Sequence, residues 1–557
     1  MKRRDFVKAG ALAGAALPLG RAGILTRPKA RQKRRQHVFR ASSVGLTPFV
    51  DALPIPPVLP TATNYTVSMS QISQKLHRDL PPTRLFGYNG RYIGPTFEAR
   101  RGHPINVRWT NNLPSSHFLP VDNTLHGDEP GTPEVRTVVH LHGHKVLPES
   151  DGYPEAWFTR NFAQKGPFWV SDTYHYPNDQ QSMMLWYHDH ALGNTRLNVA
   201  SGLAGIYFIR DDYEDGLNLP DGPFEIPLMI QDRAFRSDGQ IDYPAEGVTA
   251  QHPVWIPEYF GDVSVVNGKV MPFLEVEPRR YRFRMLNASN ARFYNLALDS
   301  GQSFTQIGGD QGFLPQPVRL RNLLLGVAER ADVIIDFSRQ RGRRIILTND
   351  AAAPFPDGDL GQVTQIMQFR VRNTSSNDNS SVPNSFMTLT PPSFNSQTRV
   401  RDITLVEIAD ADPPAGTGEP LEGLLENKHW DEPLTINPRR NNVEIWRLIN
   451  TTGDTHPIHV HLVHFFVLDR QPFDSDLYLN TGQLVFTGPR EAVDPNEANA
   501  PKDVVKSPPG FVTRIVQRFE LPSTAVITPG KRFRYVVHCH ILEHEDNEMM
   551  RPFDVVA

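Results

Sequence analysis

Residues 532–549 read RFRYVVHCHILEHEDNEM and give the strongest indication of the fold. Arginine alternates with an aromatic residue up to Tyr535, and this period of two predicts a β-strand. If the strand continues, His538 and His540 point to one face and Cys539 points to the other. Three histidines and one methionine at set offsets from a given cysteine would arise by chance with a probability of roughly one in a million. One strand is therefore predicted to contact two neighbouring metal sites.

The same period of two recurs along the chain. In residues 280–285, RYRFRM, it places Tyr281, Phe283 and Met285 on one face. The 49 prolines outnumber the 39 glycines, and proline interrupts helices. Short strands separated by Gly, Pro and Asn predict an all-β chain of β-sandwiches. Further strand-like runs are 105–110, 204–209, 332–337, 443–449 and 465–468.

A weak internal repeat indicates three units. A strand-like run that ends in asparagine closes at Asn111, Asn287 and Asn450, at spacings of one β-sandwich domain. The segment 373–398, rich in Ser, Asn and Pro, is typical of a linker. We therefore expect a signal and basic arm at 1–43 and three domains at 44–215, 216–372 and 399–557. The linker at 373–398 would join the second domain to the third.

Composition excludes several classes of protein. The 557 residues carry a formal net charge of −3, which excludes a generally basic nucleic-acid binder. The mean hydropathy of −0.41 excludes a protein with many membrane spans, so no stable membrane insertion is expected. The single cysteine cannot form a disulfide within the chain.

The first residues are similar to a twin-arginine export signal. Arg3 and Arg4 precede Phe6 and an apolar run over 9–19, which is too short to span a bilayer as a helix. The chain is therefore expected in the periplasm or outside the cell. The alternative is a disordered basic tail.

Ten of the 20 histidines fall in four tight groups, and each H-x-H pair on a strand would deliver two imidazoles to one place. His456 is an odd number of residues from His459, so it should face away from that histidine and pair with Cys539. His544 and Met549 would then come from the loop beyond the cysteine strand. The ten are His140, His142, His188, His190, His456, His459, His461, His538, His540 and His544.

Two imidazoles, a thiolate and a thioether are the ligands of a blue-copper electron-transfer site. Zinc rarely takes a thioether and cannot pass electrons. This set comprises His456, Cys539, His544 and Met549. The other eight histidines are too many for one metal ion, whereas three copper ions would account for them all.

In order and spacing, these motifs resemble those of the multicopper oxidases, and in particular the branch of bacterial spore-coat laccases, bilirubin oxidases and phenoxazinone synthases. The likeness rests on HLHG (140–143), DGYPEAW (151–157), WYHDH (186–190) and HCHILEHED (538–546). It implies three cupredoxin-like Greek-key domains, the middle one without copper, and four copper ions. It assigns His140 and His459 to the type 2 ion, His142, His188 and His540 to one type 3 ion, and His190, His461 and His538 to the other.

The resemblance also implies an activity. We expect a monomeric laccase-like enzyme that oxidises phenols or aromatic amines and reduces O2 to water, with Asp151 and Glu545 as acids beside the copper cluster. Bilirubin is an alternative substrate. A second alternative is the oxidation of cuprous, ferrous or manganous ions, which acidic residues near the surface edge of His456 would favour. A copper-free scaffold or a simple electron carrier is disfavoured, because every ligand position is filled and eight further histidines would be unused.

Overall fold

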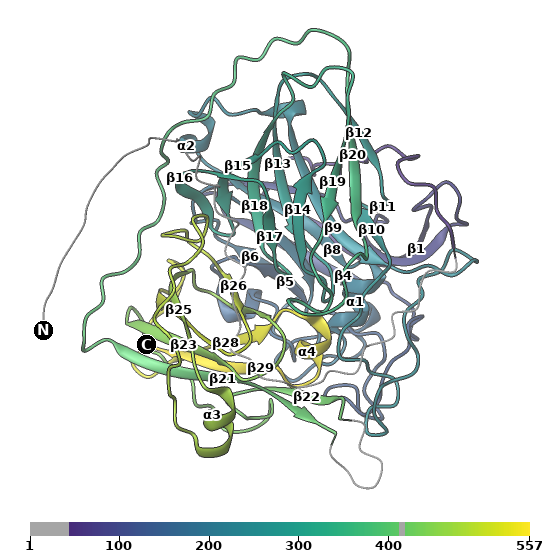
Figure 1. The fold of residues 1–557 in the computed structure, drawn as a ribbon. Helices are drawn as coiled ribbons and strands as arrows, with labels where there is room; N and C mark the ends of the chain where they lie inside the picture. Colours follow the sequence, from purple (N-terminus) through teal and green to yellow (C-terminus); the bar gives the residue numbers. More distant parts are fainter. Residues whose placement is uncertain (1–43, 411–417) are drawn as a thin grey trace, which may run out of the picture. The chain divides into compact units, whose positions relative to one another are not determined.

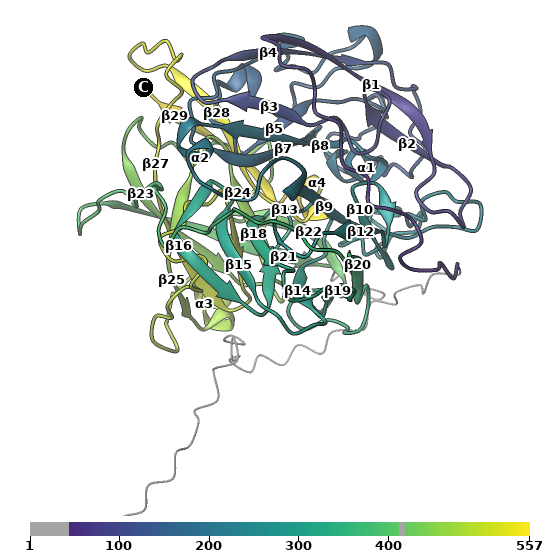
Figure 2. The same ribbon diagram turned by 90° about the horizontal axis from the view of Figure 1, so that it is seen from above.

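The computed structural model describes residues 44–410 and 418–557. The predicted export signal at 1–43 lies outside the described residues. Strands dominate this part of the chain, and they form six sheets in three consecutive strand groups. Figure 1 shows the third strand group, in green to yellow, gathered apart from the teal second group, and Figure 2 shows the purple and blue first group from above.

The first strand group consists of two four-stranded sheets, β2-β1-β4-β6 and β3-β8-β7-β5. Alternate side chains of both sheets, including Trp109 and Tyr187, bury a shared apolar core. The eight strands are β1 (Asn64–Gln74), β2 (Thr83–Tyr88), β3 (Phe97–Arg100), β4 (Ile105–Asn111), β5 (Val139–His142), β6 (Thr173–Tyr176), β7 (Met183–Asp189) and β8 (Ala204–Arg210).

The second strand group has sheets in the orders β11-β10-β9-β13-β18-β15-β16 and β12-β20-β19-β14-β17. Tyr281, Phe283 and Met285 share its core, as the alternation predicts. The strands are β9 (Glu225–Arg233), β10 (Val263–Val266), β11 (Lys269–Val270), β12 (Phe273–Val276), β13 (Arg280–Asn287), β14 (Tyr294–Leu298), β15 (Phe304–Gly309), β16 (Gly312–Leu320), β17 (Leu323–Leu325), β18 (Arg330–Asp336), β19 (Arg344–Asn349) and β20 (Gln365–Val371).

The third strand group has sheets in the orders β22-β21-β23-β27-β25 and β26-β24-β28-β29. Its core includes Trp446, Cys539 and Met549, so the cysteine is packed inside the sandwich. The strands are β21 (Arg399–Ala409), β22 (Pro420–Leu425), β23 (Val443–Asn450), β24 (His456–Val460), β25 (Phe465–Pro472), β26 (Val504–Ser507), β27 (Phe511–Arg518), β28 (Arg532–Cys539) and β29 (Met550–Val556).

Helices are few and short, as the proline content predicts. None in the described part of the chain has both the length and the apolar character needed to cross a membrane. They are α1 (Thr195–Ser201), α2 (Asp212–Asp215), α3 (Ser475–Thr481) and α4 (Leu542–Asp546).

Candidate metal centre

Strand register brings the predicted histidines together from two of the strand groups. In the first group His140 on β5 lies directly opposite His188 on β7, and in the third group His459 on β24 lies opposite His538 on β28. Residues directly opposite on antiparallel strands have Cβ atoms about 4.5–5.5 Å apart. The ring centroids of His142 and His459 stack 3.7 Å apart, which joins the two strand groups.

The eight histidines form one buried cluster, and none is more than 1% exposed. Their ring nitrogens fall into three sets, and within each set the nitrogens lie within 4.8 Å of one another. His142 belongs to two of the sets. The sets are His140, His142 and His459; His142, His188 and His540; and His190, His461 and His538.

Backbone carbonyls contact Nδ1 of four of these rings, His538 among them, and in the other three they leave Nε2 without a partner. The Nδ1 atoms of His140, His188 and His459 lie 2.6, 2.8 and 2.7 Å from the carbonyl oxygens of Asp151, Asp189 and Asp503. A carbonyl can only accept, so each Nδ1 carries a hydrogen and donates it, which leaves a lone pair on Nε2. In all three rings Nε2 is buried without a hydrogen-bond partner. Lone pairs that converge in this way fit metal ions.

His142 has the opposite orientation. Its Nε2 lies 3.2 Å from Oδ1 of Asp503, and its Nδ1 lies 3.2 Å from Nε2 of His540. His142 therefore presents Nδ1 to the cluster, whereas the rings held by carbonyls present Nε2.

Burial keeps these rings neutral. Loss of solvation lowers the pKa of His188 and of His459 to about 3, and it lowers the pKa values of His140 and His142 well below the usual range. A neutral imidazole is the form that binds metal.

Both predicted acids lie against the cluster. Oδ2 of Asp151 is 2.8 Å from Nδ1 of His461, and burial raises the pKa of Asp151. Glu545 lies between two rings, with Oε1 3.3 Å from Nδ1 of His190 and Oε2 3.1 Å from Nδ1 of His538. Each acid is 1% exposed, so neither lies in a solvated loop.

Asp189, which lies between two cluster histidines, has structural partners instead. Its carboxylate accepts hydrogen bonds from the backbone N–H groups of Val138 and Ala191 and from the side-chain amide of Asn198, at 3.0, 3.1 and 2.8 Å. These bonds tie β7 to the strand that carries His140 and to helix α1.

A second cluster lies on the reverse face of β28. Sγ of Cys539 is 3.5 Å from Nδ1 of His456 and 3.8 Å from Nδ1 of His544, and these two nitrogens are 3.3 Å apart. Burial raises the pKa of the Cys539 thiol well above its usual value, so a metal ion must displace its proton. The backbone N–H of Ile541 donates a hydrogen bond of 3.4 Å to the sulfur.

His544 departs from expectation in its local structure. The prediction of a loop was wrong here, because residues 542–546 form helix α4. The carbonyl of Ile541 accepts from the N–H groups of both His544 and Glu545 and so starts the helical turn. The buried helix directs His544 to the cysteine and Glu545 to the histidine cluster.

Met549 lies beside the cysteine. Its N–H donates to the carbonyl of His544, and its carbonyl accepts from the N–H of Cys539, each at 2.9 Å. The side chain is fully buried, and a Cβ added to Gly423 on β22 would lie 3.7 Å from its sulfur.

Three contact residues were missed by sequence reasoning. Asp503 contacts two cluster histidines, but it stands at no recognisable spacing from the histidine motifs in the sequence. Oγ1 of Thr452 lies 2.7 Å, and Oε1 of Glu407 lies 3.8 Å, from Nε2 of His456. Thr452 lies four residues before His456 and Glu407 lies on strand β21, and neither belongs to a histidine motif whose spacing could have marked it.

Known proteins are similar to this chain in sequence and in fold. Sequence profiles described as multicopper oxidase match residues 132–214 and 397–557. Laccases of Bacillus stratosphericus and Bacillus subtilis (strain 168) are each 46% identical, over 92% of this chain and 100% and 99% of theirs. The crystal structure of a laccase from Pediococcus acidilactici Pa5930 is 26% identical with a TM-score of 0.71, over 93% of this chain and 95% of its own. The likeness confirms the predicted all-β, cupredoxin-like fold. The chain belongs to the multicopper oxidases, oxidoreductases that bind four copper ions.

Proposed function

We propose that this multicopper oxidase takes single electrons from phenols or aromatic amines at the cysteine cluster and delivers them to the eight-histidine cluster, where O2 is reduced to water. One observation carries the proposal: Cys539 belongs to one cluster, and its sequence neighbours His538 and His540 belong to the other. The three consecutive residues His538, Cys539 and His540 would thus form the electron path between the clusters. When bound, copper supplies one-electron redox chemistry at the cysteine and multi-electron reduction of O2 at the histidines.

We assign the copper ligands from the sets of converging nitrogens. The blue site comprises His456, Cys539 and His544, with Met549 as the weak axial ligand. In the larger cluster the type 2 ion would be held by His140 and His459, and the two type 3 ions by His142, His188 and His540 and by His190, His461 and His538. The orphaned lone pairs and the 4.8 Å sets support this assignment.

Protons must reach the histidine cluster together with the electrons, because reduction of O2 to water consumes both. Glu545 is positioned to hold a proton at its carboxylate beside His190 and His538. Asp151 orients His461 through its side chain and His140 through its backbone carbonyl. Both acids are buried, so a proton held there is kept from bulk water.

The test uses the copper-loaded full chain with a substituted phenol and a matched aromatic amine. We expect four substrate oxidations for each O2 consumed and no release of hydrogen peroxide. Cys539→Ser should lose the blue colour while much of the copper stays bound. A blue Cys539→Ser protein, or a wild-type protein that binds fewer than four copper ions, would refute the proposal.

Oxidation of low-valent metal ions is a second candidate, favoured by Glu407. This carboxylate lies 3.8 Å from the ring nitrogen of His456 that points away from Cys539, and its side chain is 17% exposed. A cation held by Glu407 would be separated from the proposed blue site only by the ring of His456. We expect Glu407→Gln to raise the KM for cuprous ion and leave the KM for a neutral phenol unchanged. The same assay with bilirubin tests the alternative that bilirubin is a substrate.

We also propose that the chain is exported through its paired arginines. The order Arg3, Arg4 and Phe6 before an apolar run supports this. Fractionation of cells that express Arg3→Lys/Arg4→Lys should find the double variant retained in the cytoplasm. Export at the wild-type level would exclude this route.

A further inference from the structure

Asp503 connects two copper-site histidines through different atoms. Its backbone carbonyl accepts from Nδ1 of His459 at 2.7 Å, and its Oδ1 lies 3.2 Å from Nε2 of His142. A carboxylate that accepts from Nε2 of His142 leaves Nδ1 of that ring free to face the cluster. Asp503 therefore determines which nitrogen His142 presents.

The carboxylate of Asp503 is itself held by Arg330 of the second strand group. Nη1 donates to Oδ1 at 2.6 Å and Nη2 donates to Oδ2 at 2.5 Å, which is a bidentate pair. Both side chains are almost completely buried, at 1% and 0% exposure. A buried carboxylate requires a cation of this kind to stay ionised, because burial without a partner favours the neutral acid.

Arg330 uses all five of its N–H donors. Besides the two bonds to Asp503, Nε donates to the carbonyl of Met184 at 3.3 Å, Nη1 to that of Ala328 at 3.0 Å and Nη2 to that of Asp310 at 2.9 Å. Met184 lies on β7, the strand that carries His188, and Asp503 immediately precedes β26. One guanidinium thus connects all three strand groups.

Gln311 supplies a second contact from the same strand group. Its Nε2 lies 2.6 Å from Oδ2 of Asp503 and 2.8 Å from the carbonyl of Gly143, the residue that follows His142. The side chain of Asp503 and the backbone next to His142 are therefore held by one amide group.

We propose that Arg330, assisted by Gln311, is a positioning residue for the copper cluster: it keeps Asp503 oriented so that His142 binds through Nδ1 and His459 through Nε2. The second strand group, which supplies none of the clustered histidines, would then govern copper binding at the boundary of the other two. This inference rests on the assignment of His142 and His459 as copper ligands.

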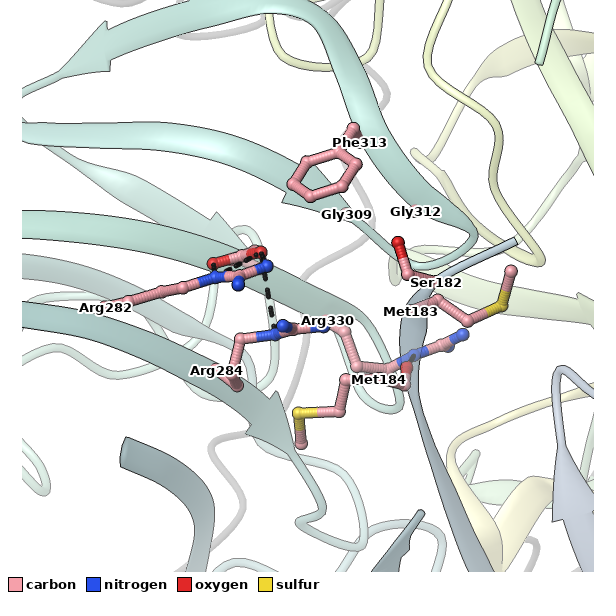
Figure 3. Close-up of a pocket in the computed structure, with 11 residues that line it drawn as sticks. Ser182, Met183, Met184, Arg282, Arg284, Gly309, Gly312, Phe313 and Arg330 are labelled. Atoms are coloured by element: carbon pink, nitrogen blue, oxygen red, sulfur yellow. Dashed lines mark hydrogen bonds and ion pairs between the residues drawn. The ribbon is translucent and has the colours of Figure 1, made fainter. Parts of the chain in front are cut away.

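The chain offers a matched control in Arg282. Arg330 and Arg282 line the same cavity, as Figure 3 shows. Its volume is about 10 Å³, room for about one water molecule. Arg282 is also buried and pairs with carboxylates, those of Asp332 at 2.5 Å and Glu214 at 2.8 Å. Asp332 is on β18, and neither it nor Arg282 contacts a clustered histidine.

The experiment compares the copper-loaded wild type with Arg330→Met, Arg330→Lys and Arg282→Met. Each is dialysed against graded concentrations of a copper chelator. Bound copper is then measured by elemental analysis, the type 2 ion by electron paramagnetic resonance, the type 3 pair by its near-ultraviolet band and the cysteine-bound ion by its blue colour. Loss of an outer partner of a metal ligand lowers metal affinity about 10- to 100-fold.

We expect Arg330→Met to lose type 2 and type 3 copper at about 10- to 100-fold lower chelator concentration while it keeps its blue colour. Arg330→Lys should fall between it and the wild type, because lysine keeps the charge without the planar fork. Arg282→Met should match the wild type. Equal copper loss in both methionine variants, or none in Arg330→Met, would overturn the inference.

If Arg330→Met does not fold, Gln311→Leu provides the answer. It removes one contact to Asp503 and should shift the same two signals in the same direction by a smaller amount. A folded Gln311→Leu protein with wild-type type 2 and type 3 signals would overturn the inference. Failure of the ligand assignment itself would show in the wild type, as fewer than four bound copper ions.

Discussion

Glu545→Gln tests the role of the acid between the two histidines. In the wild type one carboxylate oxygen lies 3.3 Å from Nδ1 of His190 and the other lies 3.1 Å from Nδ1 of His538, although neither contact has hydrogen-bond geometry. Glutamine keeps the shape and one acceptor, but it turns an NH2 group toward one ring N–H. It also has no proton to give.

Two effects contribute to the expected loss, and they differ in size. A full hydrogen bond to a charged group contributes about 1.5–3 kcal/mol, a factor of roughly 10–150 in rate, and this range is an upper bound for losing one of the weaker contacts of Glu545. Losing a general acid costs about 10²- to 10⁴-fold. A fall in the rate of O2 reduction well beyond about 150-fold would therefore require proton transfer, not positioning alone.

The assay separates the two half-reactions by stopped flow. Without O2, substrate bleaches the blue colour, and this step should change less than about twofold in Glu545→Gln, since the acid lies at the other cluster. Re-oxidation by O2 should slow by about 10²- to 10⁴-fold. Glu543→Gln is the matched control, because Glu543 is on the same helix, is fully buried and binds Tyr243 and Asn290. Equal slowing of both half-reactions, or an equal effect of Glu543→Gln, would refute the reasoning.

Three further predictions concern the blue site, its packing and the stability of the fold. Met549→Leu should raise the redox potential of the blue copper, because axial donation is lost; a potentiometric titration that finds it unchanged or lower excludes Met549 as a ligand. Gly423→Ala adds a Cβ 3.0 Å from Cε of Met549, so we expect a shifted blue absorption band and a loss of about 1–3 kcal/mol in unfolding free energy; an unaltered spectrum would show that the methionine sulfur does not respond. His126 lies 3.0 Å from Glu548. The hydrogen bond to Glu548 raises the pKa of His126. Burial acts to raise the pKa of Glu548, but the hydrogen bonds from His126 and from the Trp430 backbone, with the nearby histidine charges, together lower it. The stability that His126 contributes is complete below its ordinary pKa and is lost as pH rises through its raised pKa. The stability that Glu548 contributes is present above its ordinary pKa and is lost as pH falls through its lowered pKa. We therefore expect His126→Gln to lower the free energy of unfolding, measured in urea, by about 0.2–1 kcal/mol in the range of about pH 4.5 to 6.5 and by less at pH 9. A loss that does not depend on pH would contradict this.

The site was predictable from sequence where it depends on local strand geometry. An H-x-H pair needs only an extended backbone to direct both rings to one face, and this holds for His140 and His142 on β5. The same period of two places the side chain of Cys539 on the face opposite to His538 and His540. The strands at 280–285 and 532–535 were predictable for the same reason, and the structure contains them in β13 and β28.

The remaining features depend on contacts between distant segments. Arg330 and Asp503 are 173 residues apart, and no period or spacing connects them. The helical turn that carries His544 is only five residues long, too short for an apolar period to reveal it. Its conformation follows from burial against α1 and β22, which sequence alone does not show.

The cluster joins parts of the chain that are made at very different times. His142 and His540 are separated by 398 residues, yet their ring nitrogens lie 3.2 Å apart. A ribosome completes the first histidine pairs long before the last ones exist, and domains generally fold as they emerge. Until residue 540 has left the exit tunnel and the last sheet has closed, the nascent chain has only half a site. The eight-histidine cluster can therefore bind its full set of metal ions only after both ends of the polypeptide have folded.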